Sequence, residues 1–111
     1  VGKLMTSELL GLGLIDTADV QNEDPNWPAY KKYFMHGTSH HMGLDTHDYG
    51  LLWEPMKTNM VFTVEPGIYI PEEGFGIRLE DDVVIQEKGA PLNLMKNIPI
   101  AIEEIEDIMN S

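Results

Sequence analysis

The sequence predicts an α+β fold in which antiparallel strands are accompanied by helices. Two β-rich runs, residues 60–65 and 77–85, are separated by a turn-forming segment, residues 71–74. With 111 residues, 42% of them apolar, the chain has the size and composition of one folded domain. Near both ends, apolar residues recur at helical spacing, and the stripe that predicts a closing helix consists of Ile102, Ile105, Ile108 and Met109.

The first predicted element is an amphipathic helix over residues 2–12 that ends at glycine. Its apolar positions and the glycines near its end are Val1, Leu4, Met5, Leu9, Leu12, Gly11 and Gly13. Residues 16–28 are polar and contain two prolines, so we expect a loop there, followed by a short element over residues 30–34. Because a core helix begins at the first residue and no initiator methionine precedes it, we expect the chain to be a fragment of a longer protein.

The two β-rich runs predict a hairpin with a defined register. If residues 71–74 form a four-residue loop, Ile70 pairs with Phe75, and the same register sets Glu65 opposite Glu80. Like charges directly across a ladder destabilise it. A cation between the two carboxylates would turn that repulsion into a binding site.

All four histidines of the chain lie within twelve positions, at His36, His40, His41 and His47. Histidine is the commonest metal ligand and the side chain that titrates near neutral pH, so the cluster indicates metal or acid/base chemistry. The chain has no cysteine, and any metal must therefore be held by nitrogen and oxygen atoms. The imidazole of His40 with the carboxylates of Glu65 and Glu80 forms a donor set that suits Mn²⁺, Co²⁺, Fe²⁺ or Zn²⁺, and its oxygen content favours Mn²⁺.

Charge and hydropathy exclude several classes of partner. The formal net charge of −12 argues against nucleic acid, because neutralising phosphates requires a surplus of lysine and arginine. No apolar run is long enough to span a membrane, and the first residues lack the pattern of a signal peptide. We therefore expect a cytoplasmic protein that binds neither nucleic acid nor membrane.

Three motifs follow one another along the chain, and together they carry a resemblance to a known family. They are H-G-x-S-H-x-x-G-L-D-x-H-D at residues 36–48, V-E-P-G-x-Y at residues 64–69 and G-I-R-x-E-D at residues 76–81, where x is a position outside the motif. In this order they resemble the Xaa-Pro aminopeptidase (aminopeptidase P) branch of the pita-bread metallopeptidases (family M24), which include prolidase, methionine aminopeptidase and creatinase. The resemblance implies that residues 1–111 are the C-terminal half of the catalytic domain, a curved antiparallel sheet with helices on its outer face.

The resemblance implies a centre of two divalent metal ions, with Mn²⁺ favoured and Co²⁺ or Zn²⁺ as alternatives. His40 and Glu65 would ligate one ion, and Glu80 would bridge both. The family places two further aspartate ligands upstream of the histidine motif, where this chain has only a helix and a polar loop. The chain would therefore supply three of five ligands, and the missing N-terminal half of the same domain would supply the others.

The resemblance also implies catalytic roles for four side chains. Glu65 would shuttle a proton, His47 would help to stabilise the tetrahedral intermediate, and His36 would contact the substrate near its proline. Arg78 would orient the carboxylates around the metals. Judged from the residues alone, His36 and His47 could instead make structural hydrogen bonds, and Arg78 could simply balance nearby acids. His41 lies outside the motif positions and is expected to be exposed or partly packed.

The implied function of the parent protein is metal-dependent release of the N-terminal residue from Xaa-Pro peptides, through attack by a metal-activated hydroxide. The substrate would be a proline-containing peptide, and the parent would be a homo-oligomer. Two alternatives stay open: an Xaa-Pro dipeptidase (prolidase), or a non-catalytic pita-bread binding module. The binding module is disfavoured because it has no need of metal ligands. The isolated chain is expected to be inactive.

Overall fold

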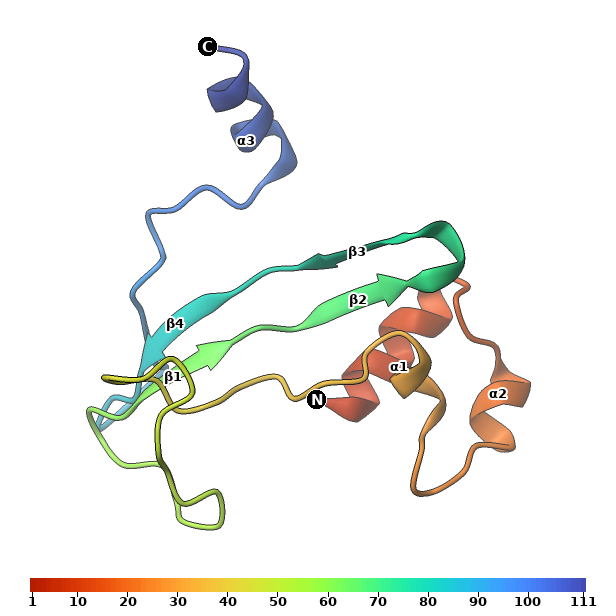
Figure 1. Cartoon of the computed structure of the whole chain (residues 1–111), viewed down its shortest axis with the longest axis horizontal. Helices are drawn as coiled ribbons and strands as arrows, with labels where there is room; N and C mark the ends of the chain where they lie inside the picture. The colour runs from red at the N-terminus through yellow and green to blue at the C-terminus, as the bar shows by residue number, and fades with distance from the viewer. The chain divides into compact units, whose positions relative to one another are not determined.

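The computed structural model describes all 111 residues and divides them into two compact units. The first unit comprises Val1–Thr38 and Pro66–Arg78, and the second comprises Ser39–Glu65 and Leu79–Ser111. Each unit contains both helix and antiparallel strand (Figure 1). The predicted α+β fold class is therefore confirmed.

Helix α1 spans Gly2–Gly11 and ends in a glycine-dependent cap. Gly13 has a φ of +70°, and its N–H donates to the carbonyl of Leu10 at 3.1 Å. The N–H of Leu14 donates to the carbonyl of Leu9 at 3.0 Å. These two bonds form a Schellman motif, which requires a left-handed residue at the position of Gly13. The prediction of a helix that ends at glycine is confirmed.

The core of the first unit is formed by side chains from α1 and the segments that follow it. Its buried members are Leu9, Ile15 and Tyr33, and Ile68 and Ile70 pack against them. The helix contributes less of its predicted apolar stripe than the sequence suggested, because three members are exposed: Val1, Leu4 and Leu12.

The expected loop over residues 16–28 contains a second helix, so that prediction was wrong for part of the segment. Helix α2 spans Thr17–Gln21 and begins with a capping box. The Asp16 carboxylate accepts the Asp19 N–H at 2.8 Å, and the Asp19 carboxylate accepts the Asp16 N–H at 2.9 Å. These paired bonds satisfy backbone donors that a helix start leaves free. The expected short element follows as the 3₁₀ helix η1, Ala29–Lys32.

The hairpin of the first unit has the predicted register. Strand β2, Gly67–Ile70, pairs antiparallel with β3, Phe75–Arg78, and Ile70 lies opposite Phe75 (Figure 1). The connection is the 3₁₀ helix η2, Pro71–Glu73, followed by a left-handed glycine. The four-residue loop expected at residues 71–74 is thus confirmed.

The second unit is built on a three-stranded antiparallel sheet with the order β1-β4-β5. Its strands are Val61–Val64, Asp81–Val84 and Leu92–Asn93. In the β1–β4 ladder Val64 lies opposite Asp81. Strand β5 has only two residues and was not predicted.

The second β-rich run, residues 77–85, was expected to be continuous, but it is divided. Strand β3 ends at Arg78 and β4 begins at Asp81, so that Leu79 and Glu80 belong to neither. Continued by one pair, the β1–β4 register sets Glu80 opposite Glu65, and Pro66 follows Glu65 in the chain. Proline has no N–H to donate to a ladder, and paired carboxylates repel, which explains the break.

Helix α3, Ile102–Met109, confirms the predicted closing helix. Its apolar stripe is not buried in the second unit: Ile102 is 70% exposed and Met109 is 80% exposed. No helix in the structure is both long and apolar enough to cross a membrane.

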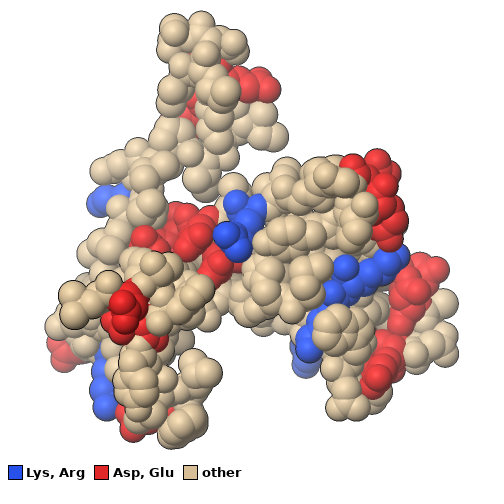
Figure 2. All heavy atoms as spheres, in the orientation of Figure 1, with Lys and Arg blue, Asp and Glu red and all other residues tan.

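Acidic side chains occur on the surface of both units (Figure 2), in keeping with the formal net charge of −12. In the first unit, Lys32 Nζ lies 3.3 Å from a Glu72 carboxylate oxygen. Hydrogen bonding to the side chain of Tyr33, and then to Glu72, raises the pKa of Lys32. The pKa of Glu72 is lowered mainly by a hydrogen bond to its own backbone and, to a smaller extent, by the hydrogen bond to Lys32. Both groups are exposed, so this pair adds little to stability.

Candidate metal centre

Three side chains of types that can ligate a metal lie close together in the second unit. One donor atom from each of His40, Glu65 and Glu80 can be chosen so that all lie within 4.8 Å of one another. Glu65 directly follows β1, Glu80 directly precedes β4, and the β1–β4 register, continued by one pair, sets the two residues opposite each other. The sheet therefore brings together carboxylates that are fifteen positions apart in the sequence.

The segment that contains His40 is held along β1 by backbone hydrogen bonds. The N–H of Thr63 donates to the His40 carbonyl at 3.1 Å, and the N–H of Met42 donates to the Val61 carbonyl at 3.1 Å. Between these bonds, His41 and Phe62 form an antiparallel bridge. The segment thus extends the edge of the sheet and carries the imidazole of His40 to the end of β1.

A single hydrogen bond determines which nitrogen of His40 is available to a metal. Its Nδ1 lies 2.9 Å from the carbonyl oxygen of His41. A carbonyl can only accept, so Nδ1 carries the hydrogen, and in the neutral ring Nε2 then presents a lone pair. Bonding of one ring nitrogen to a carbonyl is the usual way in which a ligating imidazole is oriented. Nε2 lies 3.1 Å from Glu65 Oε1.

The spacing and chemistry of these donors fit a divalent cation. Two ligand atoms about 2.1 Å from one ion and at right angles to each other are about 3.0 Å apart. The Nε2–Oε1 separation of 3.1 Å is close to this value. Lone pairs on these two atoms repel each other at this distance. A proton or a metal ion between them supplies the positive charge that attracts both. An imidazole with carboxylates suits Mn²⁺, Co²⁺ or Zn²⁺.

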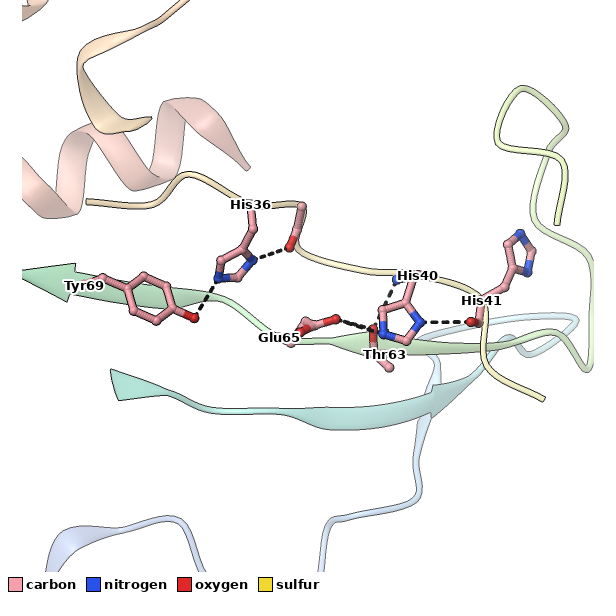
Figure 3. A network of polar contacts seen from close by, with 7 residues as sticks. His36, His40, His41, Thr63, Glu65 and Tyr69 are labelled. Carbon is pink, nitrogen blue, oxygen red and sulfur yellow. Dashed lines mark hydrogen bonds and ion pairs between the residues drawn. The ribbon is translucent and has the colours of Figure 1, made fainter. Parts of the chain in front are cut away.

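The side chain of Thr63 connects the segment that contains His40 with Glu65. This side chain, on β1, is 1% exposed. The hydroxyl accepts the backbone N–H of His40 at 3.1 Å and donates to Glu65 Oε1 at 3.1 Å, and Figure 3 shows it between these two residues. Thr63 is not among the site residues predicted from the sequence.

His47 and His36 have different surroundings. The ring of His47 is exposed and meets the His40 ring edge-on, with 4.6 Å between centroids. His36 lies in the first unit, where its Nδ1 donates to the Gly37 carbonyl at 2.7 Å. Its Nε2 accepts the hydroxyl of Tyr69 at 2.8 Å (Figure 3). Tyr69, which the sequence analysis noted only as a motif position, thus fixes the ring of His36.

Arg78 is the last residue of β3 and belongs to the first unit, opposite Gly67 in the ladder. Its side chain is exposed.

His41 is partly packed, since its ring lies 4.3 Å from that of Phe62 and against Gly50.

Comparison with known proteins shows the family to which the chain belongs. The profile of metallopeptidase family M24 matches residues 5–87, and the chain belongs to this family. The antiparallel sheet with its helices is part of the pita-bread fold, as the sequence analysis expected.

Several relatives that the chain resembles are named as Xaa-Pro peptidases. The chain is 41% identical to the Xaa-Pro aminopeptidase of Escherichia coli K12, over 98% of this chain and 27% of that protein. The Xaa-Pro dipeptidase of Pyrococcus furiosus is 45% identical over 56% of this chain and 19% of its own length. The solved structure of Pseudomonas aeruginosa aminopeptidase PepP has a TM-score of 0.77 and 34% identity, covering 95% of this chain and 26% of that one. The chain thus spans about a quarter of the length of the curated Xaa-Pro aminopeptidases it matches.

Proposed function

We propose that the chain forms the C-terminal part of the catalytic domain of a metal-dependent Xaa-Pro aminopeptidase. The observation that carries the proposal is the convergence of His40, Glu65 and Glu80 donor atoms within 4.8 Å. Membership of family M24 and similarity to Xaa-Pro aminopeptidases supply the reaction class. The substrate is then a peptide with proline in its second position.

In this proposal, His40, Glu65 and Glu80 would hold the divalent ions, with Mn²⁺ as the preferred metal. When bound, the ions would polarise the scissile carbonyl and activate a water molecule. Glu65, a largely buried carboxylate, acts as general base and acid: it accepts a proton from the attacking water and donates it to the leaving nitrogen.

The remaining side chains act on the substrate. His47, whose ring meets that of His40, donates a hydrogen bond to the oxygen of the scissile carbonyl as negative charge develops there. His36, with both ring nitrogens engaged by Gly37 and Tyr69, provides a fixed surface next to the substrate proline. Arg78 orients carboxylates by its positive charge.

Three ligands are few for two metal ions, which need bridging groups that clamp both. The proposal therefore places two further carboxylate ligands in an N-terminal half of the same domain, outside these 111 residues. The length of the related aminopeptidases supports this, because the chain covers 27% of the Escherichia coli protein.

A dipeptidase remains the second candidate, because the chain is also similar to an Xaa-Pro dipeptidase. The two activities differ in whether a residue is required after the proline. Hydrolysis of Ala-Pro-Ala together with failure to hydrolyse Ala-Pro would assign the aminopeptidase, and the reverse pattern would assign the dipeptidase.

The central experiment replaces His40 in the full-length protein that contains this chain. His40→Ala removes the imidazole donor, and we expect Mn²⁺ affinity and hydrolysis of Ala-Pro-Ala to fall by at least about 100-fold, more than losses from indirect contacts. His41→Ala is the matched control, since it removes a neighbouring imidazole but keeps the carbonyl that orients His40. Equal Mn²⁺ affinity in His40→Ala and wild type would sink the proposal. So would wild-type protein that binds no divalent metal.

A further inference from the structure

We infer that Thr63 is a positioning residue for the metal centre, and that its hydroxyl sets metal affinity by fixing His40 relative to Glu65. The inference rests on the proposed function, because it concerns the same donor group. It assigns a role to a side chain that ligates nothing itself.

The directions of the two hydrogen bonds of Thr63 follow from the chemistry of its partners. The backbone N–H of His40 can only donate, so the threonine hydroxyl accepts it, at 3.1 Å. The hydrogen of the hydroxyl is then directed to Glu65 Oε1, also at 3.1 Å, and an ionised carboxylate can only accept. The N–H of His40 therefore donates to the hydroxyl oxygen while the hydroxyl hydrogen is donated to Glu65, so the two hydrogen bonds form at the same time.

The hydroxyl oxygen replaces a backbone carbonyl as the acceptor of one sheet hydrogen bond. Residues 40 and 63 lie side by side, and the N–H of Thr63 donates to the carbonyl of His40. In a regular antiparallel ladder the N–H of His40 would return a bond to the carbonyl of Thr63. It donates to the side-chain oxygen instead. The backbone position of a proposed metal ligand thus depends on one hydroxyl.

Burial makes this arrangement difficult to replace. Thr63 is 1% exposed and Glu65 is 9% exposed, so water has little access to either hydrogen bond. Loss of the hydroxyl leaves a backbone donor and a carboxylate oxygen without this partner. The backbone donor belongs to His40 and the carboxylate oxygen to Glu65. When these two side chains are held less rigidly, they bind a metal ion less tightly.

The experiment measures Mn²⁺ affinity directly, by electron paramagnetic resonance of free Mn²⁺, in the full-length protein that contains this chain. Thr63→Val keeps the shape of the side chain and removes the hydroxyl. We expect it to bind Mn²⁺ about 10–100-fold more weakly than wild type, the usual effect of losing an indirect contact to a metal site. Thr58→Val is the matched control on an exposed threonine of the same unit and should bind as wild type does.

A second pair of variants covers the case in which Thr63→Val does not fold. Thr63→Ser and Thr63→Ala both lose the methyl group, but only Ser keeps the hydroxyl. We expect Ser to retain near wild-type affinity and Ala to lose affinity as Val does, whatever happens to thermal stability. A merely structural role would move the melting temperature of both and the Mn²⁺ affinity of neither.

Equal Mn²⁺ affinity in wild type, Thr63→Val and Thr63→Ala would overturn the inference and leave the proposed function intact. Failure of the proposed function gives a different result. In that case wild type itself binds no Mn²⁺ and does not cleave Ala-Pro-Ala, and the inference falls with it.

Discussion

The effect of Glu80 on stability depends on whether a divalent ion is bound between it and Glu65. Extension of the β1–β4 register places it opposite Glu65, where two carboxylates repel each other. The same two charges attract a divalent ion. One side chain therefore destabilises the metal-free protein and stabilises the metal-bound one, and these opposite effects can be separated by experiment.

The Glu80→Gln variant keeps the size of the side chain and removes its charge. Without metal, we expect the free energy of unfolding to rise by about 0.2–1 kcal/mol, because a like-charge pair is lost. With metal, we expect Mn²⁺ affinity to fall by at least about 10-fold. Urea unfolding in a chelator and Mn²⁺ titration measure the two effects in the full-length protein.

Glu87→Gln is the control for this prediction, because Glu87 is an exposed carboxylate just after β4 in the same unit. It should change neither quantity. Unchanged Mn²⁺ affinity in Glu80→Gln would remove Glu80 from the donor group.

At the scale of elements, the end of α1 depends on a backbone conformation that favours glycine. Gly13 has a φ of +70°, which other L-residues adopt only at a cost, whereas Gly11 lies within the helix. Gly13→Ala is expected to lower the free energy of unfolding by about 1–2 kcal/mol. Gly11→Ala is expected to leave it unchanged or raise it by up to about 1 kcal/mol. No atom lies within 4 Å of an added Cβ at either position, so the two substitutions differ in backbone strain alone.

Thermal or urea unfolding of the two alanine variants checks this prediction. A loss of stability in Gly11→Ala as large as that in Gly13→Ala would contradict it, because packing rather than φ would then be responsible.

The elements that could be predicted are those whose signals lie in neighbouring residues. The glycine-capped helix and the register that pairs Ile70 with Phe75 both follow from local turn chemistry. Helix α2 was missed because five residues are too few for a periodic pattern, and its signal is the pair Asp16 and Asp19. Strand β5 is defined by pairing with β4, which its own two residues do not reveal.

The same distinction holds for the candidate site. The motifs identified His40, Glu65 and Glu80 as a donor set, and the structure brings these three together. The function of Thr63 could not be predicted, because it depends on how residues 40–42 lie along β1. Side-chain hydrogen bonds of this kind are a consequence of tertiary pairing.

For the whole molecule, exposed apolar side chains indicate a surface that other protein covers. Large exposed apolar residues rarely gather on the surface of a complete protein. In the second unit they fall in two stretches of the sequence: Leu44, Tyr49, Leu52, Trp53 and Met56 before β1, and Ile102, Ile105, Ile108 and Met109 on α3. This agrees with the proposal that an N-terminal half of the domain supplies both the missing ligands and the missing contacts.

The proposal predicts that the 111-residue chain by itself, supplied with Mn²⁺, does not hydrolyse Ala-Pro-Ala. Its three donors lack the bridging groups that hold two ions, and its exposed apolar surface favours association over a well-ordered site. Co-expression with the remaining N-terminal part of the same protein should restore both Mn²⁺ binding and hydrolysis, measured by metal content and by release of alanine. The same co-expression with His40→Ala should restore neither, which distinguishes rebuilding of the site from activity of the added part. Robust hydrolysis by the 111-residue chain alone would show instead that His40, Glu65 and Glu80 suffice for catalysis.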